Sequence, residues 1–280
     1  MMLISGFLDY LTKLAPPRAR HRIQLQRLHR WRNLEPEFYI LHALVDVGKA
    51  CIDVGSNEGF YAAEMARWAR AVHCIEPNPR LASDLKAKLP RNVIVHDVAA
   101  SNCVGDAILR IPLDHGVEFH GTATIEPRNA LAGAHGLNEV KCRVAPLDQL
   151  IDDAIGFLKI DVEGHELAVL EGCQRILSEQ RPVILIESEK RHHAQAPENV
   201  FRLLGQFGYN GYFVSGGALR SIATFDAARD QRIDDDHADH KSSITAARQK
   251  HYVNNFIFMS DNGAVRARIE AAIVEWDKRG

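Results

Sequence analysis

Several signatures that identify large classes of protein are missing from this chain of 280 residues. No apolar run approaches the roughly 18 residues that predict a transmembrane helix. The amino-terminal MMLISGFLDYLTKLAPP also lacks the early basic region of a signal peptide. The five cysteines are odd in number and form no C-x-x-C pair, which argues against a zinc site or a disulfide framework. These absences predict buried free thiols, a reducing compartment and a cytoplasmic location.

Strong charge and phosphate-binding loops are missing as well. The formal net charge is −2, so the whole-chain balance does not indicate a nucleic-acid partner. No G-x-x-x-x-G-K-[ST] loop occurs, and neither does the G-x-G-x-x-G turn that brings backbone close to a pyrophosphate. Hydrophobic residues make up 46% of the chain, which is enough for an ordinary globular core.

A strand, a glycine turn and a helix are predicted in succession over residues 50–68. The apolar strand pattern ends at Asp53, two glycines follow at Gly55 and Gly59, and helical spacing of apolar residues comes next. A second apolar run ends at Glu76. In a doubly wound fold this order places two carboxylates at the carboxyl edges of neighbouring strands, where a nucleoside ligand binds.

The turn itself indicates which nucleoside ligand to expect. Glu58 would put negative charge beside any phosphate, so a cofactor with a ribose and a cation but no phosphate fits better. S-adenosylmethionine has both groups. Its amino and sulfonium groups favour acidic surroundings, and Glu76 can accept hydrogen bonds from two ribose hydroxyls. The other interpretation is a helix-capping turn that binds no ligand.

Residues 1–34 are predicted to form an amino-terminal extension that is first amphipathic and then basic. Apolar residues recur at helical spacing over 1–15, and Pro16-Pro17 ends the pattern. Six arginines follow, with no acid between Asp9 and Glu35. They are Arg18, Arg20, Arg22, Arg27, Arg30 and Arg32. Two interpretations remain open: a helix packed on the domain with a solvated basic face, or a peripheral contact with an anionic membrane.

Strands and helices alternate through the middle of the chain, which predicts an α/β fold with a largely parallel sheet. Strands are expected at 49–54, 71–76, 92–98, 107–111, 140–144, 157–164, 182–187, 209–214 and 252–259. Helices are expected at 35–47, 60–70, 80–89, 165–171 and 197–208. The last two strands should pair at one side of the sheet. A long loop is expected from Asp114 to Asn138, and loops of that length are usually functional or mobile.

Acidic residues end four of the predicted core strands. They are Asp53, Glu76, Asp161 and Glu187, with Asp97 near the end of a fifth. Because the carboxyl ends of parallel strands meet at one edge, these residues predict a single acidic cleft at the topological switch point. Alternation along 157–164 also places Lys159, Asp161 and Glu163 on one face, where Lys159 would neutralise Asp161.

With these residues, the sequence resembles the FkbM family of S-adenosylmethionine-dependent methyltransferases. The resemblance covers about residues 35–260, and its most specific block is KIDVEGHE at 159–166. The other blocks are IDVGSNEGFY at 52–61, IEPNP at 75–79, VAAS at 98–101 with Gly105, LEG at 170–172, ILIE at 184–187 and NFIF at 255–258. Ser56 stands where the family more often has alanine, which is a small-for-small difference.

The resemblance implies a class I methyltransferase domain over residues 35–280. Its fold would be Rossmann-like and doubly wound, with a mostly parallel seven-stranded sheet. Its activity would be methyl transfer to an oxygen, typically a hydroxyl of a sugar, glycan or secondary metabolite. The family also implies the cofactor-binding residues. Asp53, Gly55 and Asn57 would line the methionine end of S-adenosylmethionine, Glu76 would hold the ribose, and Asp97 and Val98 would lie beside the adenine.

A hydroxyl acceptor has to lose its proton during methyl transfer, which otherwise depends mainly on positioning two reactants. Asp161, Glu163 and Glu187 are the candidate catalytic residues, and Glu163 and Glu187 are the better placed to hold the acceptor or take its proton. His165 is expected to face solvent in the first turn of a helix. The clustered carboxylates also permit a divalent metal such as Mg²⁺, but carboxylates alone do not specify one.

Two classes of function fit the sequence. The first is an O-methyltransferase for a small molecule or glycan, with an acceptor pocket built from residues 114–138 and 226–250. The second is a non-catalytic module that keeps the fold and binds a partner or a membrane. The acids at the strand ends favour the enzyme. A nucleic-acid methyltransferase is disfavoured, because no N-P-P-Y tetrad follows the fourth strand and no basic surface is expected beyond the amino-terminal arginines.

Overall fold

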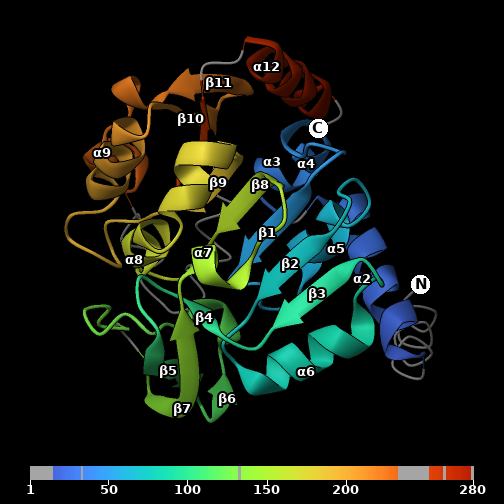
Figure 1. Ribbon diagram of the computed structural model, residues 1–280, viewed down its shortest axis with the longest axis vertical. Coiled ribbons are helices and arrows are strands. Elements are labelled where there is room, and N and C mark those ends of the chain that lie inside the picture. The colour runs from blue at the N-terminus through green and yellow to red at the C-terminus, as the bar shows by residue number, and fades with distance from the viewer. Residues whose placement is uncertain (1–14, 33, 132–133, 233–251, 261–262, 279–280) are drawn as a thin grey trace.

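An eight-stranded sheet forms the centre of the computed structural model (Figure 1). The structure describes residues 15–32, 34–131, 134–232, 252–260 and 263–278. The strand order is β11-β10-β12-β9-β8-β1-β2-β3. The strands are β1 (Ala50–Val54), β2 (Val72–Ile75), β3 (Val93–His96), β8 (Ile155–Ile160), β9 (Val183–Glu187), β10 (Tyr209–Ser215), β11 (Ala218–Ser221) and β12 (Asn255–Ser260). The five strands from β9 to β3 are parallel, and β12, β10 and β11 continue the sheet with antiparallel pairs.

The predicted doubly wound, mostly parallel sheet is confirmed, with one strand more than the seven expected. The expected pair at one side of the sheet is β10 and β12, which are antiparallel neighbours. The additional strand is β11, which pairs with β10 through the tight turn at Gly216-Gly217. β11 is short and largely exposed, so its sequence lacks the apolar alternation that would predict a strand.

Helices cover both faces of the central sheet. One face is covered by α8 (Glu166–Glu171), the π-helical turn η2 (Ile176–Gln180) and α9 (Glu198–Gln206). The other is covered by α4 (Leu41–Leu44), α5 (Phe60–Met65), α6 (Pro79–Lys88) and α12 (Gly263–Asp277). Alternate residues of the strands serve the two cores: Ile52 and Leu158 belong to the first, Cys51 and Phe157 to the second.

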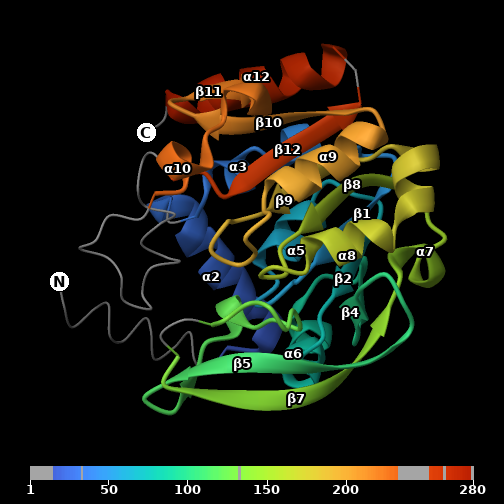
Figure 2. The ribbon, with the colours of Figure 1, turned by 90° about the vertical axis from the view of Figure 1, so that its left-hand side faces the viewer.

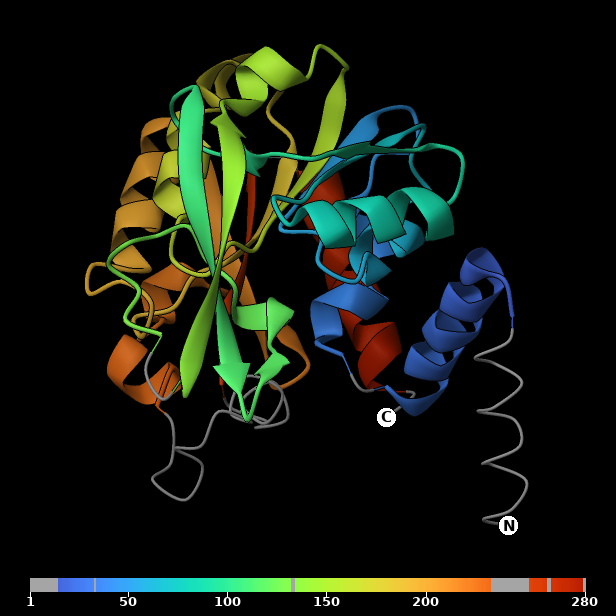
Figure 3. The ribbon, with the colours of Figure 1, turned by 90° about the horizontal axis from the view of Figure 1, so that it is seen from below.

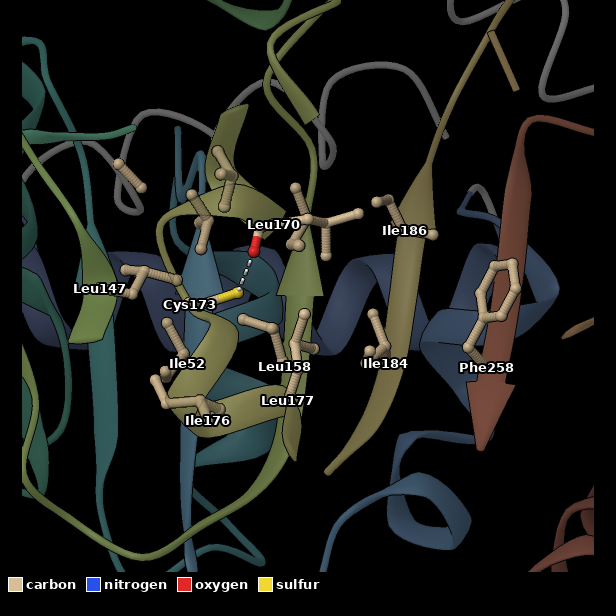
Figure 4. Close-up of a cluster of buried hydrophobic side chains, with 14 of the residues drawn as sticks. Ile52, Leu147, Leu158, Leu170, Cys173, Ile176, Leu177, Ile184, Ile186 and Phe258 are labelled. Carbon is tan, nitrogen blue, oxygen red and sulfur yellow. Dashed lines mark hydrogen bonds between the residues drawn. The ribbon is translucent and has the colours of Figure 1, made fainter. Parts of the chain in front are cut away.

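Branched aliphatic side chains make up most of the first core, which Figure 4 shows between α8, η2 and the sheet. Cys173 lies in this core, and its thiol donates to the carbonyl oxygen of Leu170 at 3.4 Å. All five cysteines are free, as predicted, and four of them are buried. Cys103 is the exposed one.

A second sheet of four strands lies apart from the first, in the order β4-β7-β5-β6 (Figure 2). Its strands are β4 (Ala99–Ala100), β5 (Gly105–Asp114), β6 (Val117–Glu118) and β7 (Gly136–Ala145). The strands predicted at 107–111 and 140–144 are β5 and β7, but they are longer and pair with each other. Within the long loop predicted between them, the described residues include β6 and the 3-10 turn η1 (His120–Thr122).

Three predicted elements end more than two residues earlier than expected. The helix predicted over 60–70 is α5, which ends at Met65. The strand predicted over 157–164 is β8, which ends at Ile160, because Glu163 has a left-handed φ of 54° that a strand cannot contain. The helix predicted over 35–47 is instead α3 (Pro36–Tyr39) followed by α4, with a break at Ile40. The carboxyl-terminal helix α12 was not predicted, although it packs Ile269 and Ile273 into the second core.

The basic stretch after residue 15 forms a regular helix, α2 (Pro17–Trp31), with Pro17 in its first turn. The helix predicted over residues 1–15 falls almost entirely outside the described residues. Most of the charged segment 226–250 also lies outside them. No helix in the described ranges is both long and apolar enough to cross a membrane.

Gly172, at the end of α8, tests how closely this helix packs against the second sheet. A Cβ atom at this position would lie 2.0 Å from the carbonyl oxygen of Ser101, which follows β4. We expect Gly172→Ala to lower the free energy of unfolding by about 1–3 kcal/mol, since backbone has to move. Gly205→Ala in α9 is the matched control, because its Cβ meets no atom within 4 Å. Equal stability of the two variants in urea would contradict this packing.

Candidate active site

A pocket lies at the carboxyl ends of β1, β2 and β8, where the strand order reverses between β1 and β8. Its empty space, including the part open to solvent, is about 600 Å³. One wall is the glycine turn after β1, and the opposite wall is segment 120–125 of the loop between β5 and β7. Polar residues that line it are Asn57, Glu76, His120, Thr124, Asp161, Glu163 and His165.

The glycine turn approaches the end of β8 so closely that residue 55 has no room for a side chain. Gly55 has a φ of +77°, and a Cβ there would lie 1.8 Å from the carbonyl oxygen of Asp161. The backbone N–H of Gly55 donates to the carbonyl oxygen of Ile75 at 3.0 Å. The turn is therefore held between the ends of β2 and β8, with its backbone exposed to the pocket.

Glu76 holds this turn through its carboxylate. Its Oε2 accepts the backbone N–H of Asn57 at 2.8 Å, and its Oε1 accepts that of Asn78 at 2.9 Å. Burial raises the pKa of Glu76 to about 7, although the two N–H groups favour the ionised form. Each carboxylate oxygen keeps a further lone pair. Beside it, the buried Oδ1 of Asn57 has no hydrogen-bond partner among the residues that the structure describes.

Asp53 lies beneath the pocket and does not line it. The Lys159 ammonium is 3.8 Å from Asp53 and 3.0 Å from Asp161, so the predicted ion pair of Lys159 with Asp161 is present. Burial by itself would lower the pKa of Lys159, but the two carboxylates raise it above its ordinary value. The ammonium also lies 4.6 Å from the centre of the Tyr61 ring. Lys159 is therefore a permanent buried cation under the acidic edge.

The structure brings the three candidate catalytic carboxylates together. One oxygen each from Asp161, Glu163 and Glu187 lies within 4.8 Å of the others. Burial, and then the charge of Asp161, raises the pKa of Glu187 well above its usual range. Oxygen ligands of this kind suit Mg²⁺. However, Lys159 and His192 already pair with two of the three carboxylates, so a divalent ion would compete with resident cations.

Glu163 is the most firmly positioned residue of the pocket. Its backbone is left-handed, and its carbonyl oxygen accepts Thr124 Oγ1 at 2.9 Å and Asn129 Nδ2 at 2.8 Å. Its carboxylate is 2.9 Å from Nε2 of His192. Burial raises the pKa of Glu163, against the opposing effect of His192. A non-glycine residue held in this strained conformation by its surroundings is a common feature of functional sites.

His192 could not be recognised from the sequence. It lies in an irregular segment between β9 and α9, which has no periodic pattern, and 29 positions separate it from Glu163. Burial would lower the pKa of His192, but the contact with Glu163 raises it. Next to it, Arg191 donates two hydrogen bonds to the Glu189 carboxylate, at 2.8 and 2.6 Å. Thr124 gave no sequence signal either, since it lies inside the long loop.

The expectation that His165 faces solvent is wrong. Its side chain is only 14% exposed, and it lines the pocket. Nε2 is 3.0 Å from Oγ of Ser101, and Nδ1 is 3.2 Å from Oε2 of Glu126. The loop that carries Glu126 covers the start of α8, which is why the first turn of this helix is not exposed. Both ring nitrogens are occupied, so His165 joins that loop to β4.

Asp97 and Val98 do not lie in the same hollow as the other predicted cofactor residues. They line a neighbouring hollow with Leu150, Arg143 and Val104. Ala99 and Ala100, the next two residues, line the first pocket. The charge of Asp97 still contributes to the raised pKa of Glu76. The segment 97–100 therefore separates two hollows.

A family model and a curated relative both match the chain. The model of the methyltransferase FkbM domain matches residues 53–212. A hexuronic acid methyltransferase, AglP from Haloferax volcanii, is 28% identical over 201 residues, which are 67% of this chain and 76% of that protein.

Two solved structures are also similar to the chain. A methyltransferase FkbM from Methylobacillus flagellatus is 19% identical, with a TM-score of 0.44 over 71% of this chain. The match covers 51% of that protein, so the chain spans about half of its length. An O-methyltransferase from Bacillus cereus, solved with SAH, is 12% identical with a TM-score of 0.40, over 89% of this chain and 94% of that one. Since the family model spans more than half of the sequence, the chain belongs to the FkbM methyltransferase family.

Proposed function

We propose that the protein transfers a methyl group from S-adenosylmethionine to a hydroxyl oxygen of a sugar, a glycan or a related small molecule. The observation that carries this proposal is the buried carboxylate of Glu163, held at the pocket wall by a strained backbone and by His192. A carboxylate with a raised pKa is suited to take a proton from a hydroxyl near neutral pH.

The residues around the glycine turn fit S-adenosylmethionine. The unpartnered Oδ1 of Asn57 is a hydrogen-bond acceptor for an amino group, and the carboxylate of Glu76 has lone pairs for ribose hydroxyls. The missing side chain at Gly55 lets the ligand approach the backbone. Asp53 supports the methionine end from below the pocket. Asp97 and Val98, which line the neighbouring hollow, are proposed to lie beside the adenine. When bound, the cofactor supplies an electrophilic methyl group.

The remaining chemistry belongs to side chains of this protein. Glu163 accepts the hydroxyl proton as the acceptor oxygen becomes nucleophilic, and His192 stabilises the Glu163 carboxylate before the transfer. Asp161 and Glu187 orient the acceptor by hydrogen bonds to its hydroxyl groups. Burial raises the pKa of Glu187, which favours the protonated form that can donate as well as accept.

A sugar acceptor is supported by the name of the similar protein from Haloferax volcanii, a hexuronic acid methyltransferase. A hexuronic acid offers both hydroxyl and carboxylate oxygens. The oxygens of Asp161, Glu163 and Glu187 offer several hydrogen-bond partners for hydroxyl groups, so the site favours methylation of a hydroxyl. The acceptor would enter between the acidic cluster and segment 120–125.

The alternative is a non-catalytic module that keeps this fold for binding a partner. Calorimetric titration with S-adenosylmethionine and S-adenosylhomocysteine separates the two functions, because a catalytic protein has to bind both. Absence of binding to either ligand would leave the non-catalytic module. Repeating turnover measurements with Mg²⁺ and with EDTA tests whether the carboxylates also use a metal.

Replacing Glu163 tests the proposed base. We expect Glu163→Gln to lower turnover by about 10²–10⁴-fold, because the amide cannot accept the proton. The affinity for S-adenosylhomocysteine should stay within about threefold, since Glu163 is not proposed to contact the cofactor. Glu171→Gln, an exposed acid of α8, is the matched control and should keep full turnover. Full turnover of Glu163→Gln would place the base elsewhere.

The chemical stability of the product tests the acceptor oxygen. Incubation with neutral and uronic-acid sugars and labelled cofactor should give methyl ethers, which survive mild alkali. A product that mild alkali hydrolyses would be a methyl ester. That result would remove the need for a base and would overturn the role of Glu163.

The ribose role of Glu76 predicts a pH dependence of cofactor binding. Its pKa is raised to about 7, so the acceptor form of the carboxylate is lost as the pH falls through that value. We expect the affinity for S-adenosylhomocysteine to weaken by on the order of tenfold across this range, as for a lost hydrogen bond to a charged group. Glu76→Gln should bind more weakly at high pH and lose this dependence. An unchanged pH profile in the variant would remove Glu76 from the ribose role.

A further inference from the structure

The helix α2 is strongly basic on its outer face. It contains no acidic residue, and four of its arginines, Arg18, Arg20, Arg22 and Arg30, are exposed. Together with Gln26, Arg18, Arg22 and Arg30 recur at every fourth position, which places these three arginines along one ridge of the helix. Among the ion pairs formed within the described part of the chain, none involves these three residues. The positive charges of these three arginines are therefore exposed to solvent and are not paired with acidic side chains of the described residues.

The inner face of α2 is attached to the domain by specific contacts. Nε2 of His21 is 3.0 Å from the carbonyl oxygen of Glu58, and its ring stacks on Phe60 at a centroid distance of 4.9 Å. Further along, Nε2 of His29 is 3.0 Å from the Glu64 carboxylate. Figures 1 and 3 show α2 at the rim of the molecule, beside α6. These contacts fix the orientation of α2 relative to the domain and leave the arginine ridge exposed.

An exposed tryptophan directly follows the last arginine of this ridge. Trp31, the last residue of α2, is 59% exposed. Arg32, which follows it, stacks 4.5 Å from the ring centre of Trp276 and so anchors the end of the helix to α12. Tryptophan rings prefer the headgroup level of a bilayer, where one end of the ring is in water and the other in an apolar layer.

We propose that the exposed surface of α2 that carries the ridge of Arg18, Arg22 and Arg30, with Trp31 next to its last arginine, docks the protein on an anionic lipid bilayer. The supporting argument is charge complementarity on a chain whose net charge is −2, so that the positive face is local and oriented. A nucleic acid would also attract arginines. The exposed tryptophan favours a bilayer, and so does the sequence before α2, where Leu3, Phe7, Leu11 and Leu14 recur at helical spacing.

The docking surface is directly connected to the candidate active site. His21 contacts Glu58 in the glycine turn, which provides one wall of the pocket. Glu58 in turn pairs with Lys88 of α6 at 2.9 Å. A protein docked through α2 therefore holds its cofactor turn one helix diameter from the lipid surface, about 10 Å.

The test is co-sedimentation of the full-length protein with vesicles of phosphatidylcholine, with and without phosphatidylglycerol. We expect binding only to the anionic vesicles, and less binding at high salt. Combining Arg18→Gln, Arg22→Gln and Arg30→Gln should reduce the partition coefficient by on the order of 100-fold, because each arginine contributes about 1 kcal/mol near such a surface. A matched control combines Lys141→Gln, Arg202→Gln and Arg220→Gln, which remove the same charge from exposed positions on other elements.

Several results would overturn the proposal. They are no binding to anionic vesicles, equal binding to neutral ones, or equal loss of binding in the control variant. Binding of an RNA oligonucleotide that the α2 variant loses, without vesicle binding, would assign the face to nucleic acid instead. Affinity for S-adenosylhomocysteine should be the same in all three proteins. That measurement separates a failed docking surface from a failed active site and shows that the variants are folded.

The fluorescence of Trp31 provides a second measurement. A purely electrostatic association with vesicles would not move this ring out of water. Its fluorescence emission should shift to shorter wavelength when anionic vesicles are added, because the ring leaves water. Trp31→Phe should remove this shift and leave most of the binding. A shift that persists in Trp31→Phe would come from Trp68 or Trp276 and would contradict insertion of this face.

Discussion

A single buried ammonium makes the acidic edge of the sheet stable. Parallel strands bring their carboxyl ends together, and four of the strands here end in carboxylates, which repel one another in a low-dielectric environment. Lys159 lies between two of them, Asp53 and Asp161, on the central strand β8. An unpaired buried charge would be strongly destabilising, so the lysine and the two acids are stable only as a group.

The other carboxylates are stabilised in different ways, and this divides the site into two halves. On the side proposed for the cofactor, two backbone N–H groups donate to the Glu76 carboxylate, and no cationic side chain pairs with it among the described contacts. On the side proposed for the acceptor, Glu163 has the imidazole of His192, and Arg191 holds the pKa of Glu189 at about 2 despite its burial. The first half of the site therefore has an acid without a cationic partner among the described residues, while the second half already contains cationic side chains.

The sequence was sufficient for the sheet, the turn and the strand-end acids, because each depends on local patterns. Apolar runs, glycine positions and a charged residue at each strand end are all readable within a few positions. Contacts that join distant irregular segments were not readable. His192 meets Glu163 only because the segment after β9 folds back over β8, and Glu126 covers His165 only because the loop between β5 and β7 crosses α8. The left-handed Glu163 also had no signal, since strand alternation predicted an extended residue there.

The close approach of Gly55 to Asp161 has a consequence for how such proteins diversify. The carbonyl oxygen of Asp161 occupies the space that a side chain at residue 55 would need. Residues 53–61 and 157–165 therefore have to change together. The segment 120–125 lines the same pocket from the loop between β5 and β7, and Thr124 joins it to the end of β8 by its hydrogen bond to the carbonyl oxygen of Glu163. The turn and the end of β8 are therefore inherited as one unit, whereas in this segment Thr124 is the residue tied to them by that bond.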